Sequence, residues 1–183
     1  DLTLYAFSSE NWKRPEAEVK ALMGLLAHFL KEKTPSLIEN NIRLQVIGQI
    51  DKLPKSNQKS LQKSIEATDG NNGLTLVVAL SYGSREEILE ATRSLMEKAQ
   101  SREMDPAELN VESFAAHLNT ADFPDPDLLI RTSGEYRISN FLLWQISYAE
   151  IFITKTFWPD FRRQNLLDAV GEYQQRQRRF GGV

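Results

Sequence analysis

The clearest pattern of hydrophobic and polar positions lies in residues 16–33, where apolar side chains recur at helical spacing. The apolar stripe consists of Val19, Leu22, Met23, Leu26, Phe29 and Leu30. This spacing predicts an amphipathic helix with one wide apolar face. Pro15 stands just before the stripe and suits the first turn of a helix, so we expect the helix to begin there.

Short apolar runs elsewhere predict strands. Residues 2–7 alternate between apolar and polar side chains, and residues 74–80 form the nearly continuous apolar run of a buried parallel strand. Further strands are predicted at residues 42–47, 128–130 and 150–153. Helices are predicted at residues 55–67, 84–99, 110–118 and 164–179. Ser84 and Glu87 have the spacing of a capping box at the start of the second of these helices.

The alternation of strands and helices predicts the α/β class, with a central, mostly parallel sheet flanked by helices. We expect residues 1–183 to form a single domain. Ligands of such sheets bind beyond the carboxyl ends of the strands. Three polar loops follow strands, at residues 8–14, 81–85 and 131–139, and we therefore expect them to converge on one edge of the sheet.

Composition and charge narrow the function classes. With 183 residues, 41% hydrophobic and 26% charged, the chain has the ordinary composition of one globular domain. A formal net charge of -3 argues against a large nucleic-acid surface. No apolar run approaches the roughly 20 residues of a membrane-spanning helix. The lack of cysteine excludes disulfides and thiolate chemistry, and the two histidines, His28 and His117, are too far apart in sequence to indicate a zinc site.

The most informative segment begins where the strand at residues 128–130 ends. Arg131, Arg137 and Ser139 offer donors that suit phosphate oxygens, and Gly134 permits a close backbone approach. These residue types predict an anion site at a strand end. The alternative is that both arginines form ordinary ion pairs with neighbouring carboxylates, those of Asp127, Glu135 or Glu150.

Apolar side chains follow the candidate anion site directly. They are Phe141, Leu142, Leu143, Trp144 and Ile146. Glu150 then offers a hard carboxylate of the kind that magnesium prefers. Together these features indicate a substrate with a diphosphate head and an apolar tail. Glu150 could also form a simple salt bridge with an arginine, and that alternative remains open.

The loop at residues 8–14 mixes donors, an acid and an aromatic side chain before the start of a helix. A helix N-terminus is a favourable place for an anion. As a single motif the loop is weak evidence, because a solvated loop with Ser9 or Asn11 as a local cap is the more common explanation of such a segment.

These segments together resemble the cis-prenyltransferase family, and most closely its bacterial members that make undecaprenyl diphosphate. The resemblance runs from Leu4 to Gly182. Its most specific blocks are residues 4–15, 127–150, 158–161 and 178–182, which appear in the family's order.

The resemblance implies a role for each of several site residues. Arg131, Arg137 and Ser139 would hold isopentenyl diphosphate, and Glu150 would bind Mg2+ together with an aspartate. The segment with Ser8, Asn11, Trp12 and Arg14 matches the loop that closes over the allylic substrate, with Asn11 and Arg14 as the catalytic residues. Arg179 looks like part of a tail that reaches the partner subunit's site, and with this resemblance the alternative, a cation that complements a helix end, becomes the weaker reading.

The resemblance also implies a fold, an activity and partners. The fold would be butterfly-like with a hydrophobic tunnel, and the chain would be a homodimer. The candidate wall residues are Leu22, Met23, Leu26, Phe29 and Leu74, with Leu76 and Val78. The enzyme would condense isopentenyl diphosphate repeatedly, with cis geometry, onto an allylic diphosphate such as farnesyl diphosphate. The product would be undecaprenyl diphosphate, the lipid carrier for cell-wall glycan synthesis. We expect a cytoplasmic enzyme with peripheral membrane contact and no nucleic-acid partner.

Two departures from the family's pattern matter. The family's Asn-Tyr-Gly-Gly-Arg reads Ser-Tyr-Gly-Ser-Arg at residues 81–85. A block that resembles Met-Asp-Gly-Asn-Gly-Arg-Trp-Ala would lie before Asp1, and with it the magnesium-associated aspartate. We therefore expect an amino-terminally truncated domain that by itself makes no product and is poorly stable.

Two other function classes remain as alternatives. The first is a non-catalytic partner subunit of a prenyltransferase complex, which the missing block favours and the retained phosphate-binding residues oppose. The second is a general nucleotide-binding domain. No glycine-rich dinucleotide fingerprint or Walker loop follows any predicted strand, so this alternative is the weaker one.

Overall fold

The computed structural model describes residues 1–177 of the chain. It divides into two compact units, Asp1–Pro124 and Asp125–Val183, which we describe one at a time. The predicted α/β class with parallel strands is confirmed. The strands form two separate parallel sheets, one with three strands and one with two, instead of the single central sheet that we expected.

The sheet of the first unit contains β1 (Leu2–Ser8), β2 (Arg43–Ile47) and β3 (Thr75–Tyr82). Its strand order is β1-β3-β2 and both pairings are parallel, so β3 is the central strand. Val77 and Ala79 on β3 are almost fully buried, which agrees with the continuous apolar run in the sequence.

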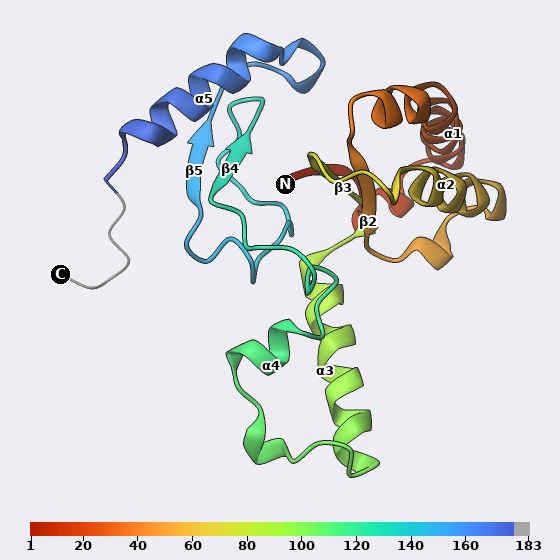
Figure 1. Ribbon diagram of the computed structural model, residues 1–183, viewed down its shortest axis with the longest axis vertical. Coiled ribbons are helices and arrows are strands. Elements are labelled where there is room, and N and C mark those ends of the chain that lie inside the picture. Colours follow the sequence, from red (N-terminus) through yellow and green to blue (C-terminus); the bar gives the residue numbers. More distant parts are fainter. Residues whose placement is uncertain (178–183) are drawn as a thin grey trace. The chain divides into compact units, whose positions relative to one another are not determined.

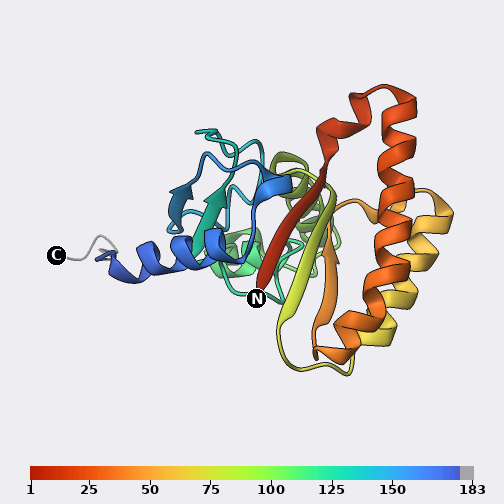
Figure 2. The same cartoon turned by 90° about the horizontal axis from the view of Figure 1, so that it is seen from above.

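Two helices, α1 (Glu16–Glu39) and α2 (Lys55–Thr68), cover one face of this sheet. They lie side by side in both cartoon views (Figures 1 and 2). Their apolar side chains meet those of the sheet in one core cluster. The cluster contains Phe7, Met23, Leu30, Leu37, Leu44, Leu53, Leu61, Leu76, Val78 and Leu80, and Leu22 and Leu26 pack against it. The apolar stripe predicted for residues 16–33 therefore faces the core, except that Phe29 is 37% exposed.

Helix α1 continues to Glu39, beyond the predicted end at residue 33, although Pro35 lies inside it. Proline removes one backbone donor, the partner of the Lys31 carbonyl. Lys31 is exposed, and Thr34 strengthens the same turn because its hydroxyl donates to Leu30 O at 2.6 Å. Thr34 Oγ1 also lies 2.8 Å from Ser64 Oγ on α2, so packing against α2 supports the helix across the proline.

The remaining elements of the first unit follow β3. They are α3 (Ser84–Gln100) and α4 (Val111–Ala115), with short 3-10 helices at Ser9–Lys13, Ile50–Lys52 and Pro106–Glu108. The predicted capping box of Ser84 and Glu87 is wrong, since the N-cap of α3 is Gly83 and no side chain caps it. Asn110 does cap α4, but this helix ends at Ala115, short of residue 118.

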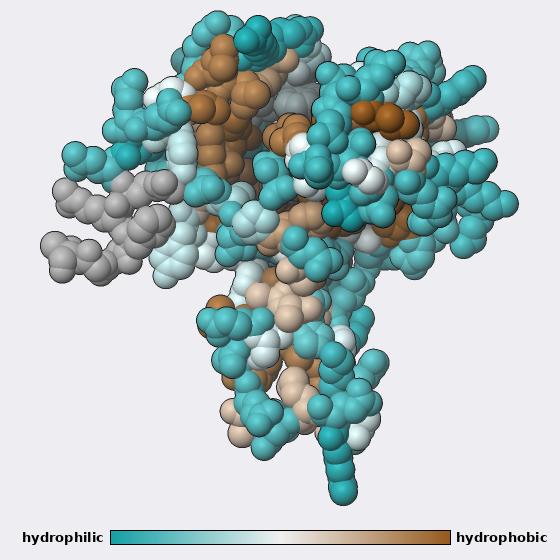
Figure 3. Space-filling model, in the orientation of Figure 1, coloured by the Kyte–Doolittle hydropathy of each residue, from teal (hydrophilic) through white to brown (hydrophobic). Residues whose placement is uncertain are grey.

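The second unit contains β4 (Leu128–Arg131), β5 (Glu150–Ile153), a 3-10 turn at Trp158–Asp160 and α5 (Arg163–Gln175). The two strands are parallel, and Leu128 pairs with Glu150. Hydrophobic side chains show at the surface of this unit (Figure 3). The exposed large ones are Tyr136, Leu143, Tyr148, Ile151, Phe157, Trp158, Leu166, Leu167 and Val170. Across both units, none of the helices in the part of the chain that the structure describes is both long and apolar enough to span a membrane.

Candidate active site

The segment of residues 8–14, which we call the Trp12 loop, turns at the carboxyl end of β1 as a 3-10 helix. Asn11 stabilises the turn, because its Oδ1 accepts a hydrogen bond of 2.9 Å from the Ser8 backbone N–H. Within residues 1–177, the Asn11 amide nitrogen makes no hydrogen bond. The side chain therefore keeps two N–H donors for a ligand.

Arg14 ends the Trp12 loop in an ion pair with Glu18, with 2.6 Å between Nη1 and Oε1. About half of each side chain is exposed, at 49% and 46%. An exposed pair of this kind contributes only about 0.2–1 kcal/mol. A diphosphate, which carries more charge than one carboxylate, can therefore displace Glu18 from the arginine at little cost.

Trp12 connects the loop to the central strand. Its indole Nε1 donates a 2.8 Å hydrogen bond to Ser81 Oγ on β3, and its ring meets that of Phe7 edge to face, with 4.9 Å between ring centroids. The indole also packs against the core cluster. Two of the three polar loops that we expected to converge, at residues 8–14 and 81–85, therefore do meet. The third lies in the second unit.

A buried polar network lies next to this contact. Tyr82 OH donates to Glu87 Oε2 at 2.6 Å, and Glu87 Oε1 accepts from the Asn119 backbone N–H at 2.9 Å. Asn119 Oδ1 in turn accepts from the Gly48 backbone N–H at 2.7 Å. The network ties the ends of β2 and β3 to the segment after α4. Burial and the neighbouring Glu87 carboxylate raise the pKa of Tyr82 well above its ordinary value.

Sequence reasoning missed this network, because the spacing of Ser84 and Glu87 matches a capping box. No pattern in the sequence marks Glu87 as buried, and only a buried carboxylate needs such donors. Glu87 is 3% exposed and has two of them.

In the second unit, β4 ends in a tight turn at residues 131–134, which we call the β4 turn. Ser133 and Gly134 both have positive φ, at 67° and 64°. Their backbone N–H groups donate to Thr156 O and Thr154 O at 2.9 and 2.8 Å, which fixes the turn against the chain after β5. Gly134 takes the left-handed geometry that glycine adopts at no steric cost.

Arg131, the last residue of β4, has a buried Nε without a hydrogen-bond partner among the described residues. A buried guanidinium donor that lacks an acceptor is costly, by about 1–3 kcal/mol, unless a ligand supplies the acceptor. The side chain is therefore suited to an anion. Within residues 1–177, Arg131 does not form the ordinary ion pair that was its alternative reading.

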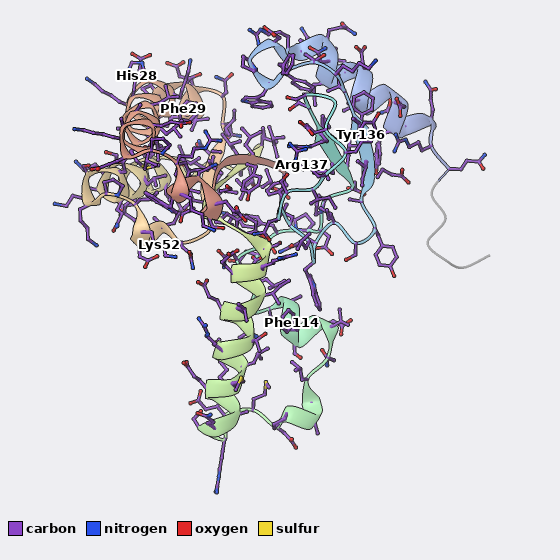
Figure 4. All side chains as sticks on the ribbon, turned by 180° about the vertical axis from the view of Figure 1, so that it is seen from behind. His28, Phe29, Lys52, Phe114, Tyr136 and Arg137 are labelled. Atoms are coloured by element: carbon purple, nitrogen blue, oxygen red, sulfur yellow. The ribbon has the colours of Figure 1, made fainter. Side chains whose placement is uncertain are left out.

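Arg137 lies on the irregular segment between β4 and β5, next to Tyr136 (Figure 4). It forms an ion pair with Glu135, as the alternative reading of this residue proposed, and its side chain is 67% exposed. Such a pair is weak and can exchange for a phosphate. Ser139 is also exposed, with a φ of 56°. The structure therefore places one half-buried arginine with a buried Nε and two exposed polar residues within the predicted anion segment.

Glu150 lies at the start of β5, opposite Leu128, whereas Arg131 lies opposite Ile153. Three residues of strand, about 10 Å, separate these two ends. Glu150 Oε2 accepts from Arg176 Nη1 at 2.8 Å, and both side chains are partly buried. Hydrogen bonds to Glu172 and Glu150 raise the pKa of Arg176. The Glu150 N–H donates to Asp127 O at 2.9 Å, which brings a second acidic residue to this end of the sheet.

A magnesium site at this end would have Glu150 as its protein ligand. The described residues contain no cluster of three or more histidine, aspartate or glutamate side chains that could hold a metal ion. Magnesium commonly binds through one or two carboxylates and takes its other ligands from phosphates and water. Glu150 fits that pattern, because its carboxylate already attracts a cation, Arg176.

The predicted tunnel residues fall into two groups. Leu22, Met23 and Leu26 on α1 belong to the core cluster or pack against it, as do Leu76 and Val78 on β3. Phe29 and Leu74 are 37% and 43% exposed. Figure 4 shows Phe29 on α1. Arg179, predicted to reach a partner subunit, lies outside the described residues.

The chain is similar to proteins of known class along nearly its whole length. The model of the family described as putative undecaprenyl diphosphate synthase matches residues 1–181. Isoprenyl transferase of Bacillus cereus is 50% identical over 182 residues, which cover 100% of this chain and 70% of the relative. Isoprenyl transferase of Porphyromonas gingivalis is 52% identical over 180 residues, 98% of this chain and 71% of the relative.

Two solved structures are also similar. Lavandulyl diphosphate synthase from Lavandula x intermedia, in complex with dimethylallyl diphosphate, has a TM-score of 0.96 and 36% identity, over 99% of this chain and 78% of that one. A probable undecaprenyl diphosphate synthase from Campylobacter jejuni has a TM-score of 0.88 and 35% identity, over 99% and 83%. These findings do not favour the non-catalytic subunit. The chain belongs to the undecaprenyl diphosphate synthase family, and it is a prenyltransferase that carries out cis-prenyl chain elongation.

Proposed function

We propose that the two polar clusters divide the substrates between them. The β4 turn and the segment that follows it, with Arg131, Arg137 and Ser139, bind the diphosphate of isopentenyl diphosphate. The Trp12 loop, with Asn11 and Arg14, acts on the allylic diphosphate. The observation that carries the proposal is the buried Arg131 Nε, which has no hydrogen-bond partner in residues 1–177 at the end of β4.

The Trp12 loop assists departure of the allylic diphosphate. When the allylic C–O bond breaks, negative charge grows on the diphosphate oxygens, and the isopentenyl double bond attacks the carbon that is left. A new C–C bond forms, and loss of one proton restores a double bond. Donors directed at the growing charge lower the barrier. The Asn11 NH2 group makes no hydrogen bond to residues 1–177 and Arg14 has an exchangeable partner, so both suit this role.

Magnesium is the cofactor that we propose for the reaction. Glu150 would hold it, and the ion would supply positive charge to a diphosphate. Arg176 must then move away from the Glu150 carboxylate or share it with the ion.

The growing hydrocarbon chain needs an apolar surface that excludes water. We propose that α1 and β3 supply this surface through Leu22, Met23 and Leu26 on the helix and Leu76 and Val78 on the strand, with Phe29 and Leu74 at its more exposed margin. Trp12 supports the assignment, because it both packs against the core cluster and belongs to the polar loop. Head group and tail can therefore bind at adjoining surfaces of the first unit.

We further propose that the enzyme is a homodimer and makes undecaprenyl diphosphate in the cytoplasm, with peripheral membrane contact during product release. The exposed side chains of Phe157, Trp158 and Leu167 support the proposal that a partner chain or a membrane surface covers this face of the second unit. Light scattering of the purified protein would give the mass of one chain if the dimer is wrong.

Calorimetric titration of isopentenyl diphosphate tests the central assignment. Arg131→Ala should weaken binding about 10- to 100-fold, because a charge-assisted contact contributes about 1.5–3 kcal/mol. Arg131→Lys should recover only part of this loss, since lysine lacks the guanidinium fork. Arg43→Ala is the matched control, because Arg43 pairs with Asp69 at the surface of the first unit. Equal affinity in Arg131→Ala and the control would overturn the proposal.

A further inference from the structure

Ser81 marks the point at which β3 departs from regular strand geometry. Phe7 pairs with Leu80 and Ser8 pairs with Tyr82, so Ser81 is an extra residue without a partner on β1. Its φ of 51° is in the left-handed region, which a serine seldom adopts. Such a β-bulge redirects the side chain that it carries, and bulges are uncommon between parallel strands.

The bulge has a visible consequence for the Ser81 hydroxyl. Strict alternation would direct Ser81 to the opposite face of the sheet from Leu80. Trp12, however, packs against the core cluster that contains Leu80, and its indole reaches Ser81 Oγ at 2.8 Å. Ser81 is fully buried, so water does not compete with the Trp12 indole for its hydroxyl oxygen. The backbone carbonyl of Ser81 also accepts from the Gln49 N–H at 3.3 Å, which links the bulge to the end of β2.

Ser8, the first residue of the Trp12 loop, pairs with Tyr82 on β3, whereas the hydrogen bonds of the two candidate catalytic side chains lie elsewhere. Asn11 bonds within the loop to Ser8, and Arg14 bonds forward to Glu18 on α1. The indole therefore links the two candidate catalytic side chains to the central strand through one hydrogen bond and its apolar packing. A change in the acceptor at position 81 should shift the loop without touching either catalytic residue.

We propose that Ser81 is a positioning residue, whose hydroxyl holds the Trp12 indole and thereby sets where Asn11 and Arg14 meet the allylic diphosphate. The inference rests on the proposed role of the Trp12 loop. Ser81 occupies the position where the family motif has asparagine. Asparagine also offers an acceptor oxygen and tolerates left-handed φ, so it is the conservative replacement at this bulge.

The first experiment reads the contact directly. The chain has three tryptophans, and their indole N–H signals can be resolved by NMR with 15N labelling, with the Trp12 signal assigned by its loss in Trp12→Phe. Ser81→Ala should shift that signal and speed its exchange with water, and Ser81→Asn should restore both. Ser64→Ala is the control, because Ser64 is an equally small, buried hydroxyl that bonds to Thr34 on α1, away from the loop. An unchanged Trp12 signal in Ser81→Ala would overturn the proposal.

The second experiment reads the consequence for binding. Ser81→Ala should weaken binding of a non-reactive allylic thiodiphosphate about 3- to 10-fold, the effect of one lost hydrogen bond, and leave isopentenyl diphosphate affinity unchanged. Ser81→Asn should rescue the loss. Trp12→Phe removes the donor and leaves β3 intact, so it should give the same pattern even if Ser81→Ala folds poorly.

The outcomes separate the two proposals. If the parent protein binds the allylic analogue and both Ser81→Ala and Trp12→Phe bind it equally well, the positioning role is wrong and the function stands. If Asn11→Ala and Arg14→Ala also leave that affinity unchanged, the Trp12 loop has been assigned to the wrong substrate.

Discussion

Arg176 Nη1 lies 2.8 Å from Glu150 Oε2, so the carboxylate at the start of β5 is paired with a cation that follows α5. If Glu150 binds magnesium, the ion competes with Arg176 for the same oxygen atoms. Arg176 is therefore a competitor of magnesium for the Glu150 carboxylate, and the effect of removing Arg176 should be measurable in a magnesium titration.

The first prediction follows from this competition. Arg176→Gln should lower the half-saturating magnesium concentration of the transferase reaction by up to about 5-fold, because a partly exposed ion pair contributes up to about 1 kcal/mol. Glu150→Gln should raise that concentration, since an amide keeps the shape and loses the charge. Identical magnesium titrations for Glu150→Gln and the parent would make Glu150 a structural acid only.

The second prediction concerns the apolar surface on α1. Leu26 packs against the core cluster, away from both polar clusters in sequence. Leu26→Ala should alter the distribution of product lengths without abolishing the first condensation, because it changes only the apolar wall. Chromatography of the prenyl products measures this distribution. Leu89→Ala on α3 is the control, since Leu89 is 55% exposed. If Leu26→Ala gave the same product distribution as this control, Leu26 would be a core residue without a role in the apolar wall.

The third prediction is a pH dependence. Burial and the Glu87 carboxylate raise the pKa of Tyr82 above its ordinary value of 10.0. Because the pKa of Tyr82 is higher in the folded state, Tyr82 keeps its proton up to a higher pH there than in the unfolded state. The resulting stabilisation of the folded state is fully present below pH 10 and is lost as the pH rises above it. Tyr82→Phe should cost about 1–3 kcal/mol near neutral pH, since Glu87 loses a donor.

Urea unfolding at about pH 8 and about pH 10.5 checks both parts of this prediction, because it reports the free energy of unfolding directly. The parent should lose more of that free energy between the two pH values than Tyr82→Phe does. Burial also raises the pKa of Tyr5, so part of the loss should persist in the variant. Equal losses in the two proteins would mean that Tyr82 does not couple to stability in this range.

The fourth prediction concerns Gly48, at the end of β2. Its φ is +106°, and a Cβ placed there would lie 2.2 Å from Leu80 O on β3. Gly48→Ala should therefore destabilise the protein by at least about 2 kcal/mol. Gly24→Ala on α1 is the matched control, because nothing lies within 4 Å of its added Cβ and it should stabilise the protein slightly. In thermal unfolding, we expect the midpoint temperature to fall for Gly48→Ala and to rise slightly for Gly24→Ala.

Local patterns predicted the elements well where each residue's own preference and its packing agree. The stripe from Val19 to Leu30 and the apolar run of β3 became α1 and the central strand. Pro35 is the exception, because proline usually ends a helix, whereas contacts between Thr34 and Ser64 support this helix across it.

The site was predicted less completely, because its geometry depends on partners far apart in sequence. The residue types at 131–139 indicated an anion site, but no sequence pattern could show that the Arg131 Nε is buried and the Arg137 side chain exposed. Position 81 could be recognised only as a departure from a motif. Its bulge and its bond to Trp12, 69 residues away, are properties of the folded chain.

The measurement that tests the account most directly is a crossed titration of both substrates against two variants. Arg131→Ala should lose affinity for isopentenyl diphosphate and keep its affinity for an allylic thiodiphosphate. Arg14→Ala should show the reverse, because its guanidinium lies on the Trp12 loop and not at the β4 turn. If both variants lost affinity for the same substrate, or if neither lost affinity for any, the proposed division of substrates between the two clusters would be contradicted.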